Sequence, residues 1–364
     1  MPPLTGRPSE QVGEVSGGTK PTKSEQLQAT DEITEVAPGI LRTQLPANIT
    51  GLGHVNMYVM EDERGVSVVD PGMPTKSTWV ALQERLAQIG VPLRRVHTVI
   101  VTHSHPDHYG GAERIKAESG ADIVTHRLFR TFYDPTEPPD LSVEDAATFM
   151  RSPFDPPPWG GEPMRMEFGR RMKFRVARRF PSLLRVPTPT VRIGDVERVT
   201  LAGREWVPVH TPGHTADHLC LFDPESGTLL SGDHVLPTIT PHISGLTAHG
   251  DPLTLFFDSL DKIAAFSSDV RISLPAHGTP FTNTGERVEQ IKQHHRDRLD
   301  KIRKVSIDFD RPATVNEFAQ HLFSPRAQGS MADSEAYAHL EHLRILGDFE
   351  QRDVDGVYEY VIRN

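Results

Sequence analysis

The sequence predicts an α+β fold in which β-sheets pack face to face and helices cover them. Two observations lead to this prediction. Short strand-like runs rich in β-branched residues recur between residues 39 and 275, with helical patterns interspersed among groups of neighbouring strands. Beyond residue 280 the pattern becomes mainly helical and ends in two strands, so a chain of 364 residues is expected to hold more than one domain.

The polar beginning of the chain is expected to be a flexible tail. Residues 1–30 are rich in Gly, Ser, Pro, Lys and Gln and contain almost no aromatic side chains, so they bury too little apolar surface to offset the entropy cost of ordering. The elements expected next are strands at 39–43, 54–60, 65–70, 95–102 and 121–124, a helix at 77–89 and a helix opening at Gly110.

The segment 127–189 interrupts this pattern and is expected to be an inserted cap. Prolines and glycines between residues 153 and 161 break it into two helical pieces. Between Arg165 and Arg185 there are eight basic residues and one acidic residue, in a chain whose formal net charge is −10. The second piece also has apolar residues at steps of four, as one helix face has: Met164, Phe168, Met172, Val176 and Phe180.

The remainder of the chain divides near residue 280. Strands are expected around 190–193, 197–201, 205–210, 218–223, 228–231 and 271–274, then helices at 286–307, 314–322 and 334–346, and finally strands at 348–352 and 357–362. The last two strands are separated by an Asp-Gly pair, which is a strong hairpin signal. Three helices and a hairpin resemble a winged helix. We therefore assign 31–280 to a first domain and 281–364 to a winged-helix-like domain.

Composition limits the compartment and the partners of the protein. With 37% hydrophobic and 24% charged residues, the chain has the composition of a soluble globular protein, and its net negative charge disfavours nucleic acid or an anionic membrane as partner. Cys220 is the only cysteine, so an internal disulfide is excluded. The start lacks the apolar core of a signal peptide, and no run approaches the roughly 18 apolar residues of a membrane span. We expect a cytoplasmic protein.

Residues 103–108, His-Ser-His-Pro-Asp-His, are the strongest functional signal. They follow the apolar run 95–102, so three imidazoles and a carboxylate fall in the loop at the end of a buried strand. Imidazole nitrogens suit zinc and iron, and a carboxylate among them can hold a second cation against repulsion by the first. A plain polar turn has no need of three such rings in six positions. The motif therefore predicts a site for two divalent metals.

Three further motifs follow in order, each after a strand-like run: His210-Thr211-Pro212-Gly213-His214-Thr215, Ser231-Gly232-Asp233-His234 and Pro275-Ala276-His277-Gly278. Each can bring a ligand to the same sheet edge. With residues 103–108 and the earlier Val69-Asp70-Pro71-Gly72, they make residues 31–280 resemble the metallo-β-lactamase fold superfamily. The resemblance implies an αββα sandwich, and it is nearest to the glyoxalase II and acyl-CoA thioesterase branches and to the branch with a winged-helix tail.

The resemblance also implies which residues hold the metals. The expected ions are two divalent cations, zinc first, with iron or manganese as alternatives. One metal is expected on His103, His105 and His214, and the other on Asp107, His108 and His277, with Asp233 bridging them.

We expect other polar residues near these motifs to support the ligands or to line the pocket. Asp70 matches the family's acidic residue beneath the first motif, where a carboxylate accepts the second N–H of a ligand imidazole. The family pattern places the ligand after Pro-Gly, which favours His214 over His210. His242 follows Asp233 closely enough to line the pocket, whereas the remaining histidines of this region are expected to be packing or surface residues: His218, His234 and His249.

The implied chemistry is hydrolysis. A bound divalent ion lowers the pKa of its water to about 7, so a nucleophile exists without a serine or cysteine. We expect a bridging hydroxide to attack a carbonyl carbon while Asp107 holds or accepts the proton of the water. Cys220 has no neighbouring Cys-His motif and is expected to be a buried strand thiol. No glycine-rich phosphate loop is present, so no nucleotide cofactor is expected.

The expected substrate is a thioester or ester of a small acyl compound, such as an acyl-CoA, because a thiolate leaving group needs little help from an acid. The basic cap fits this prediction. Arg170, Arg171 and Arg175 could clamp the phosphates of coenzyme A while Phe168 meets the acyl chain. The alternative is that these arginines only solvate the outer face of a helix. A lactonase is a close variant, because ring opening uses the same hydroxide.

Charge and motifs disfavour three functions other than hydrolysis of an acyl compound. The winged-helix-like tail resembles that of some superfamily members that cut RNA, but residues 284–364 carry 12 Lys and Arg against 15 Asp and Glu, which is unfavourable for phosphate contacts. A binding module with a dead site is disfavoured because every ligand position is filled. A β-lactamase is disfavoured because the chain has no export signal. A homodimer remains open.

Overall fold

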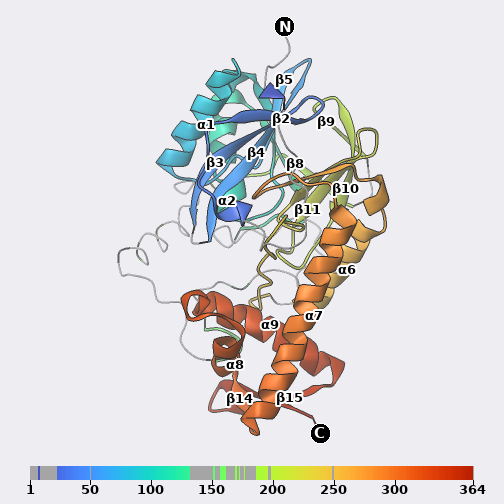
Figure 1. The fold of residues 1–364 in the computed structure, drawn as a ribbon. Helices are drawn as coiled ribbons and strands as arrows, with labels where there is room; N and C mark the ends of the chain where they lie inside the picture. The colour runs from blue at the N-terminus through green and yellow to red at the C-terminus, as the bar shows by residue number, and fades with distance from the viewer. Residues whose placement is uncertain are drawn as a thin grey trace.

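The computed structural model describes residues 7–8, 23–49, 51–131, 151, 156–160, 169, 172, 176, 186–195, 198–247 and 250–363. In these residues two large mixed sheets, each with helices on its outer face, form the upper part of Figure 1, and a group of helices with a small sheet forms the lower part. Within the described ranges, no helix is both long enough and apolar enough to cross a bilayer.

The first sheet has eight described strands that follow one another in chain order. Strands β2 to β5 pair antiparallel, and β5 to β8 pair parallel. Helices α1 (Lys76–Gln88) and α3 (Ala112–Ser119) cover its outer face, where Trp79 and Leu82 of α1 are buried against strand residues such as Val99. The strands are β1 (Arg7–Pro8), β2 (Ile33–Ala37), β3 (Ile40–Ile49), β4 (Leu52–Asp62), β5 (Gly65–Val69), β6 (Val96–Ile100), β7 (Asp122–His126) and β8 (Val191–Ile193).

The second sheet packs its inner face on the first. One apolar cluster joins Tyr58 and Met60 of β4 to Trp206 and Leu221 of the second sheet, and burial of each such side chain contributes roughly 1.5–3 kcal/mol. The strand order is β13-β12-β11-β10-β9. Its members are β9 (Val199–Leu201), β10 (Arg204–His210), β11 (Leu219–Asp223), β12 (Thr228–Gly232) and β13 (Ile272–Pro275). The expected sandwich is therefore confirmed.

Helix α6 (Pro252–Ala264) was not among the predicted elements. It begins at Asp251, whose side chain accepts a hydrogen bond from the backbone N–H of Thr254, and Pro252 occupies its first turn. Its residues Phe256 and Leu260 are fully buried against the outer face of the second sheet. Asp followed by Pro is a helix-start signal, and Leu253, Phe256, Leu260 and Ile263 recur at helical spacing after it, so the sequence itself carries the signal for this helix.

The C-terminal region consists of helices and a small antiparallel sheet. Helix α7 (Thr284–Phe309) runs from the sandwich into this region, as the orange helix of Figure 1 shows. The predicted hairpin is present, and Asp355 and Gly356 both have positive φ angles, as a two-residue turn of this hand requires. The other elements are α8 (Val315–Leu322), α9 (Ser330–Leu346), β14 (Ala313–Thr314), β15 (Phe349–Val354) and β16 (Val357–Ile362), with sheet order β14-β16-β15.

The prediction of a flexible tail through residue 30 is wrong for its last residues. Ser24–Gln26 form a 3₁₀ turn, and the Glu25 side chain is fully buried. Its carboxylate accepts hydrogen bonds from the backbone N–H groups of Thr238 and Ile239, at 2.7 and 3.0 Å. The amino-acid composition does not reveal this order, because the segment is held by the hydrogen bonds of one buried carboxylate and not by a set of buried apolar side chains.

The predicted cap lies mostly outside the described residues. Two members of its apolar stripe are described, and both Met172 and Val176 are exposed. Trp159 is buried against Tyr337 of α9, and its carbonyl accepts a hydrogen bond from the N–H of Tyr358 at 3.0 Å. This short part of the cap is thereby fixed to the C-terminal region.

Candidate metal centre

Four loops bring the predicted ligands to one edge of the sandwich. The first loop follows β6 and contains the short helix α2 (Pro106–Tyr109); the other three follow β10, β12 and β13. All the ligand side chains are buried except that of His105, which is partly exposed. They are His103, His105, Asp107 and His108 from the first sheet, and His214, Asp233 and His277 from the second.

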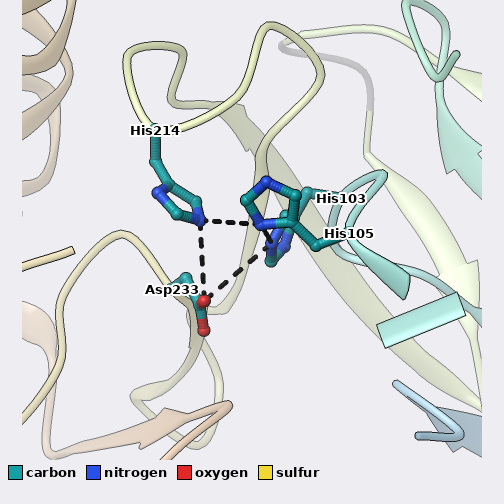
Figure 2. Close-up of side chains that lie close together, drawn as sticks. All are labelled: His103, His105, His214 and Asp233. Atoms are coloured by element: carbon teal, nitrogen blue, oxygen red, sulfur yellow. Dashed lines mark hydrogen bonds and ion pairs between the residues drawn. The ribbon is translucent and has the colours of Figure 1, made fainter. Parts of the chain in front are cut away.

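Figure 2 shows the first group of ligands, His103, His105, His214 and Asp233, whose candidate ligand atoms lie within 4.8 Å of one another. His105 Nδ1 is 3.0 Å from His103 Nε2 and 3.1 Å from His214 Nε2. Asp233 Oδ2 is 3.9 Å from His103 Nε2 and 3.6 Å from His214 Nε2. Two donors on a tetrahedral zinc ion, each about 2.0–2.1 Å from it, are roughly 3.3 Å apart. The spacing of this group therefore fits one divalent ion.

The second group consists of Asp107, His108 and His277. Asp107 Oδ2 is 3.5 Å from both His108 Nε2 and His277 Nε2. Asp233 also faces this group, because its Oδ2 is 3.6 Å from His108 Nε2 and its Oδ1 is 3.4 Å from His277 Nε2. One carboxylate thus lies between the two groups, which is the position of a bridging ligand.

Hydrogen bonds fix the tautomers of the ligand histidines. His214 Nδ1 donates to the carbonyl of His242 at 2.8 Å, and His277 Nδ1 donates to the carbonyl of His54 at 2.5 Å. A carbonyl only accepts, so in the neutral ring the proton is on Nδ1 and the lone pair is on Nε2. Both Nε2 atoms point toward the other ligands and are ready to bind a metal.

Asp70 orients one ligand of each group. Its Oδ2 accepts from His108 Nδ1 at 2.9 Å and from the Thr102 hydroxyl at 2.8 Å. Because that hydroxyl donates to Asp70, its oxygen accepts from His103 Nδ1 at 3.1 Å. Asp70 follows β5 with a φ of +51°, a left-handed conformation that Asp tolerates better than most residues. The supporting role predicted for Asp70 matches this geometry.

Several buried ligand atoms lack hydrogen-bond partners. Among the described residues, these atoms include His108 Nε2, His277 Nε2 and Asp233 Oδ1. An unpaired buried polar atom costs about 1–3 kcal/mol, so three of them at one point indicate that another group completes the site. Nitrogen and carboxylate donors suit zinc, iron or manganese. The residues present fit two divalent metal ions.

Burial and charge divide the imidazoles into two kinds. Burial lowers the pKa of His105 to about 3 and also lowers the pKa of His214, so both rings are neutral at pH 7. Burial opposes a charge on His277 too, but Asp233 and Asp107 raise the pKa of His277 to about 10. Without metal, a proton therefore remains between this imidazole and the two carboxylates, and metal binding must displace it.

A glycine allows the loop of His214 to reach the site. Gly213 has a φ of +131°, and a Cβ at this position would lie 2.6 Å from Phe256 Cα on α6. The same helix holds the loop through Ser259, whose hydroxyl donates to the carbonyl of Pro212 at 2.8 Å. The Pro-Gly-His motif is thus shaped by close contact with a helix.

Asp217 supports the first motif and was not predicted. It is buried, and its Oδ1 accepts from the Ser104 hydroxyl at 2.9 Å, between the ligands His103 and His105. Burial raises the pKa of Asp217 to about 7. The only signal in the sequence was a carboxylate three residues after His214, and its partner lies more than 100 residues earlier in the chain.

The remaining predicted residues have different places. His242 meets the site through its carbonyl, while its ring is directed to Glu335, 3.2 Å away. His210 lies outside both groups, with Nε2 donating to the carbonyl of Ala216 at 2.7 Å. His234 is fully buried, as a packing histidine is. His218 is also buried, but its Nε2 accepts from the backbone N–H of Asp233 at 3.0 Å, so it supports a ligand and was not predicted to do so. The predicted substrate contacts Phe168, Arg170, Arg171 and Arg175 lie outside the described residues, as does His249.

Two mixed sheets packed face to face, with histidines and aspartates arranged for two metals at their edge, define a metal-dependent hydrolase. The chain belongs to the Metallo-beta-lactamase superfamily, whose family model matches residues 50–277.

Relatives cover most of the chain. It is 28% identical over 302 residues to the probable metallo-hydrolase YqjP of Bacillus subtilis, with 80% of this chain and 88% of that protein aligned. It is 27% identical to a linear primary-alkylsulfatase of a Pseudomonas species, with 73% of this chain aligned but only about half, 49%, of that relative. It is 25% identical to the atrochrysone carboxyl ACP thioesterase of Passalora fulva, with 86% of this chain and 75% of that protein aligned.

A solved structure has the same fold. A metallo-beta-lactamase family protein from Thermus thermophilus is 27% identical and superposes with a TM-score of 0.69, covering 90% of this chain and 100% of that one. The likeness therefore extends beyond residue 277 into the C-terminal region.

Proposed function

We propose that this protein hydrolyses a thioester or ester of a small acyl compound, such as an acyl-CoA, with two divalent metal ions. The observation that carries the proposal is the pair of ligand groups with Asp233 between them, whose buried donor atoms lack hydrogen-bond partners. Zinc is the ion that we propose for both positions, and iron or manganese are the alternatives.

When bound, the ions supply a water of lowered pKa and positive charge for the oxyanion of an attacked carbonyl. The residues of the chain organise this chemistry. Asp233 sets the separation of the two groups. Burial would raise the pKa of Asp107, but His108 and His277 hold that pKa well below its ordinary range. Asp107 therefore stays ionised, and it is better suited to orient the water as an acceptor than to keep its proton.

Among acyl substrates we propose a thioester first, because of the chemistry of its leaving group. A thiol with a pKa near 8–9 leaves as a thiolate with little proton donation, so it makes few demands on residues beyond the metal ligands. The similarity to a protein named as a thioesterase, over 86% of this chain, supports this choice. The similarity to an alkylsulfatase is a reason to include a linear alkyl sulfate among the test substrates. A lactone tests the close variant in which the ester is cyclic.

The basic cap is proposed as the part that selects the substrate. Its eight basic residues between 165 and 185 contrast with a chain of net charge −10. Arg170, Arg171 and Arg175 are proposed to bind the phosphates of coenzyme A, and Phe168 to contact the acyl chain. Changing the three arginines to Ala should raise KM for an acyl-CoA and leave KM for a neutral lactone unchanged. Equal effects on both substrates would remove the phosphate contact from the proposal.

The C-terminal elements are proposed to form a winged-helix-like domain, residues 281–364, beside a catalytic domain of residues 31–280. Their order, α7, β14, α8, α9, β15 and β16, is the order of a winged helix with its hairpin. An endoribonuclease is the alternative that such a tail suggests. The excess of acidic over basic residues in this region, 15 against 12, opposes it.

The decisive experiment is metal analysis followed by hydrolysis assays. The purified protein should hold about two divalent ions per chain, and Asp233→Ala should hold fewer. Rates are then compared on an acyl-CoA, a glutathione thioester, a lactone, a linear alkyl sulfate and a short RNA. The proposal expects the highest kcat/KM on a thioester or ester. Two bound metals with cleavage of RNA alone, or of the sulfate alone, would overturn the substrate class and leave the metal centre intact.

A further inference from the structure

The C-terminal helices approach the metal centre through Glu335 of α9. Its Oε2 is 3.2 Å from His242 Nδ1, and the carbonyl of His242 accepts the Nδ1–H of the ligand His214 at 2.8 Å. His214 offers its Nε2 to the first metal group. Two consecutive contacts thus connect a helix near the end of the chain to a metal ligand.

The loop that carries His242 is fastened to α9 at a second point. The backbone N–H of Gly245 donates to the Ser334 hydroxyl at 3.0 Å. A Cβ at Gly245 would lie 2.6 Å from the Ser334 carbonyl oxygen and 2.6 Å from the Tyr337 ring. Loop and helix are therefore in direct contact on both sides of the buried Ile243.

The Glu335 carboxylate is itself held in place. It is buried, and its Oε1 accepts from the Arg298 guanidinium of α7. Arg298 in turn lies over the Phe323 ring, 4.9 Å from its centroid. A buried carboxylate bonded on both oxygens has little freedom, so it fixes the ring of His242 and, with it, the direction of the adjacent carbonyl.

We propose that Glu335 is a positioning residue for the metal ligand His214, acting through His242, so that the C-terminal region completes the metal centre of the N-terminal sandwich. This inference rests on the proposed two-metal function. It assigns to α7 and α9 a role in metal affinity that does not depend on which substrate is hydrolysed.

Glu335 also lies near His295 and His339, and these three residues could be mistaken for a third metal site. His339 Nδ1 donates to the Glu335 carbonyl at 2.7 Å, which leaves His339 Nε2 to accept from His295 Nδ1 at 3.0 Å. His339 therefore has no lone pair left for a metal, and the one remaining imidazole lone pair of the cluster is that of His295 Nε2, which has no hydrogen-bond partner in the part of the chain that the structure describes. The Arg298 guanidinium beside Glu335 would also repel a cation. We assign this cluster to the support of Glu335.

The expected effect is on metal affinity. Groups hydrogen-bonded to a metal ligand are worth about 10–100-fold in affinity or activity. Glu335 acts one residue further out, so loss of its carboxylate should weaken the affinity of the first group by roughly tenfold, the low end of that range. The second group, which does not contain His214, should keep its affinity.

The test uses the full chain with Glu335→Ala, Glu335→Gln and the control Glu341→Gln. Glu341 lies on the same helix, is also buried and pairs with Arg344 and Tyr360 rather than with the His242 loop. Zinc affinity is measured by competition with a chromophoric chelator, and the geometry of the first group by the visible spectrum of the Co²⁺-loaded protein. The thermal midpoint of each metal-free variant reports any general loss of structure.

The proposal expects weaker binding and an altered Co²⁺ spectrum for both Glu335 variants, with Glu341→Gln like wild type. His242→Ala should have a similar effect, and combining it with Glu335→Ala should add little, because both act on one connection. Wild-type affinity and spectrum in Glu335→Gln, or fully additive effects in the double variant, would overturn it. If wild type binds two metals but hydrolyses no tested substrate, the proposed function fails while these measurements still decide the role of Glu335.

Discussion

Asp70 Oδ2 and His108 Nδ1 lie 2.9 Å apart at the bottom of the metal centre. A second pair in the first sheet, Asp62 Oδ1 and His97 Nε2, has the same distance of 2.9 Å but lies away from the site. The two pairs differ in what the second nitrogen of the imidazole faces. For His108 it faces the carboxylates of Asp107 and Asp233, whereas for His97 it meets the Thr98 hydroxyl at 2.8 Å. Only the His108 imidazole is therefore placed to bind a metal.

Replacing Asp70 with Asn should weaken both metal groups. The amide nitrogen cannot accept the His108 N–H, and the connection through Thr102 to His103 loses its charged acceptor. We expect metal affinity to fall about 10–100-fold. Competition with a chelator measures this, and Asp62→Asn is the matched control. If metal affinity fell equally in both variants, the loss would come from a general decrease in protein stability and not from the contact between Asp70 and His108.

Asp233→Asn should lose the stabilisation that metal gives. A ligand bound only to the folded state adds about 2.7 kcal/mol when its concentration is about 100 times its Kd. Zinc should therefore raise the thermal midpoint of wild type and have little effect on the variant, which lacks the charged bridge. The midpoint is measured with and without a chelator, followed by zinc in excess. A full response to zinc in the variant would show that Asp233 is not shared between the metals.

Gly213→Ala should displace His214. The new methyl group would meet the backbone of Phe256, and the positive φ adds strain, so we expect a loss of about 3 kcal/mol in stability together with reduced metal content. Gly120→Ala is the control, since its φ is +75° but no heavy atom lies within 4 Å of the added Cβ. It should cost about 1 kcal/mol and keep the metals. Urea unfolding and metal analysis check both expectations.

Asp217→Asn should stabilise the metal-free protein at alkaline pH. The folded state raises the pKa of Asp217 from 3.8 to about 7 because the side chain is buried. Its contribution to stability is therefore full below pH 3.8 and is lost as the pH rises through 7. The variant, which never ionises, should match wild type near pH 4 and exceed its free energy of unfolding by roughly 4 kcal/mol at about pH 8, because each unit of pKa shift is worth about 1.4 kcal/mol. Urea unfolding at the two pH values is the measurement, and a pH-independent difference would contradict it.

The metal centre could be predicted because its donors follow strands. Strand ends are local in sequence, and the sheets carry His103, His214 and His277 to one edge whatever the loops between them do. The support of these ligands could not be predicted in the same way. Glu335 is 93 residues from His242, and Asp217 is 113 residues from Ser104, so only the folded chain reveals these pairs.

The errors in the fold have two different causes. Helix α6 could have been predicted, because its buried residues Leu253, Phe256, Leu260 and Ile263 recur at helical spacing after an Asp-Pro start. The ordered end of the tail was missed because Glu25 is fixed by backbone N–H groups of a distant loop. The end of α9 and the final hairpin were predicted well, since the glycine cap at Gly347 and the Asp-Gly turn are local signals, whereas the start of α9 at Ser330 has no side-chain cap and was placed at Ser334.

Each of the two ligand groups takes donors from both sheets: His103 and His105 with His214, and Asp107 and His108 with His277. A metal pair held this way joins the first half of the chain to the second, as a disulfide would, in a protein whose lone Cys220 is buried and can form no internal disulfide. The unfolding rate in excess zinc should accordingly be slower than in chelator, because the sheets cannot separate until those cross-links break.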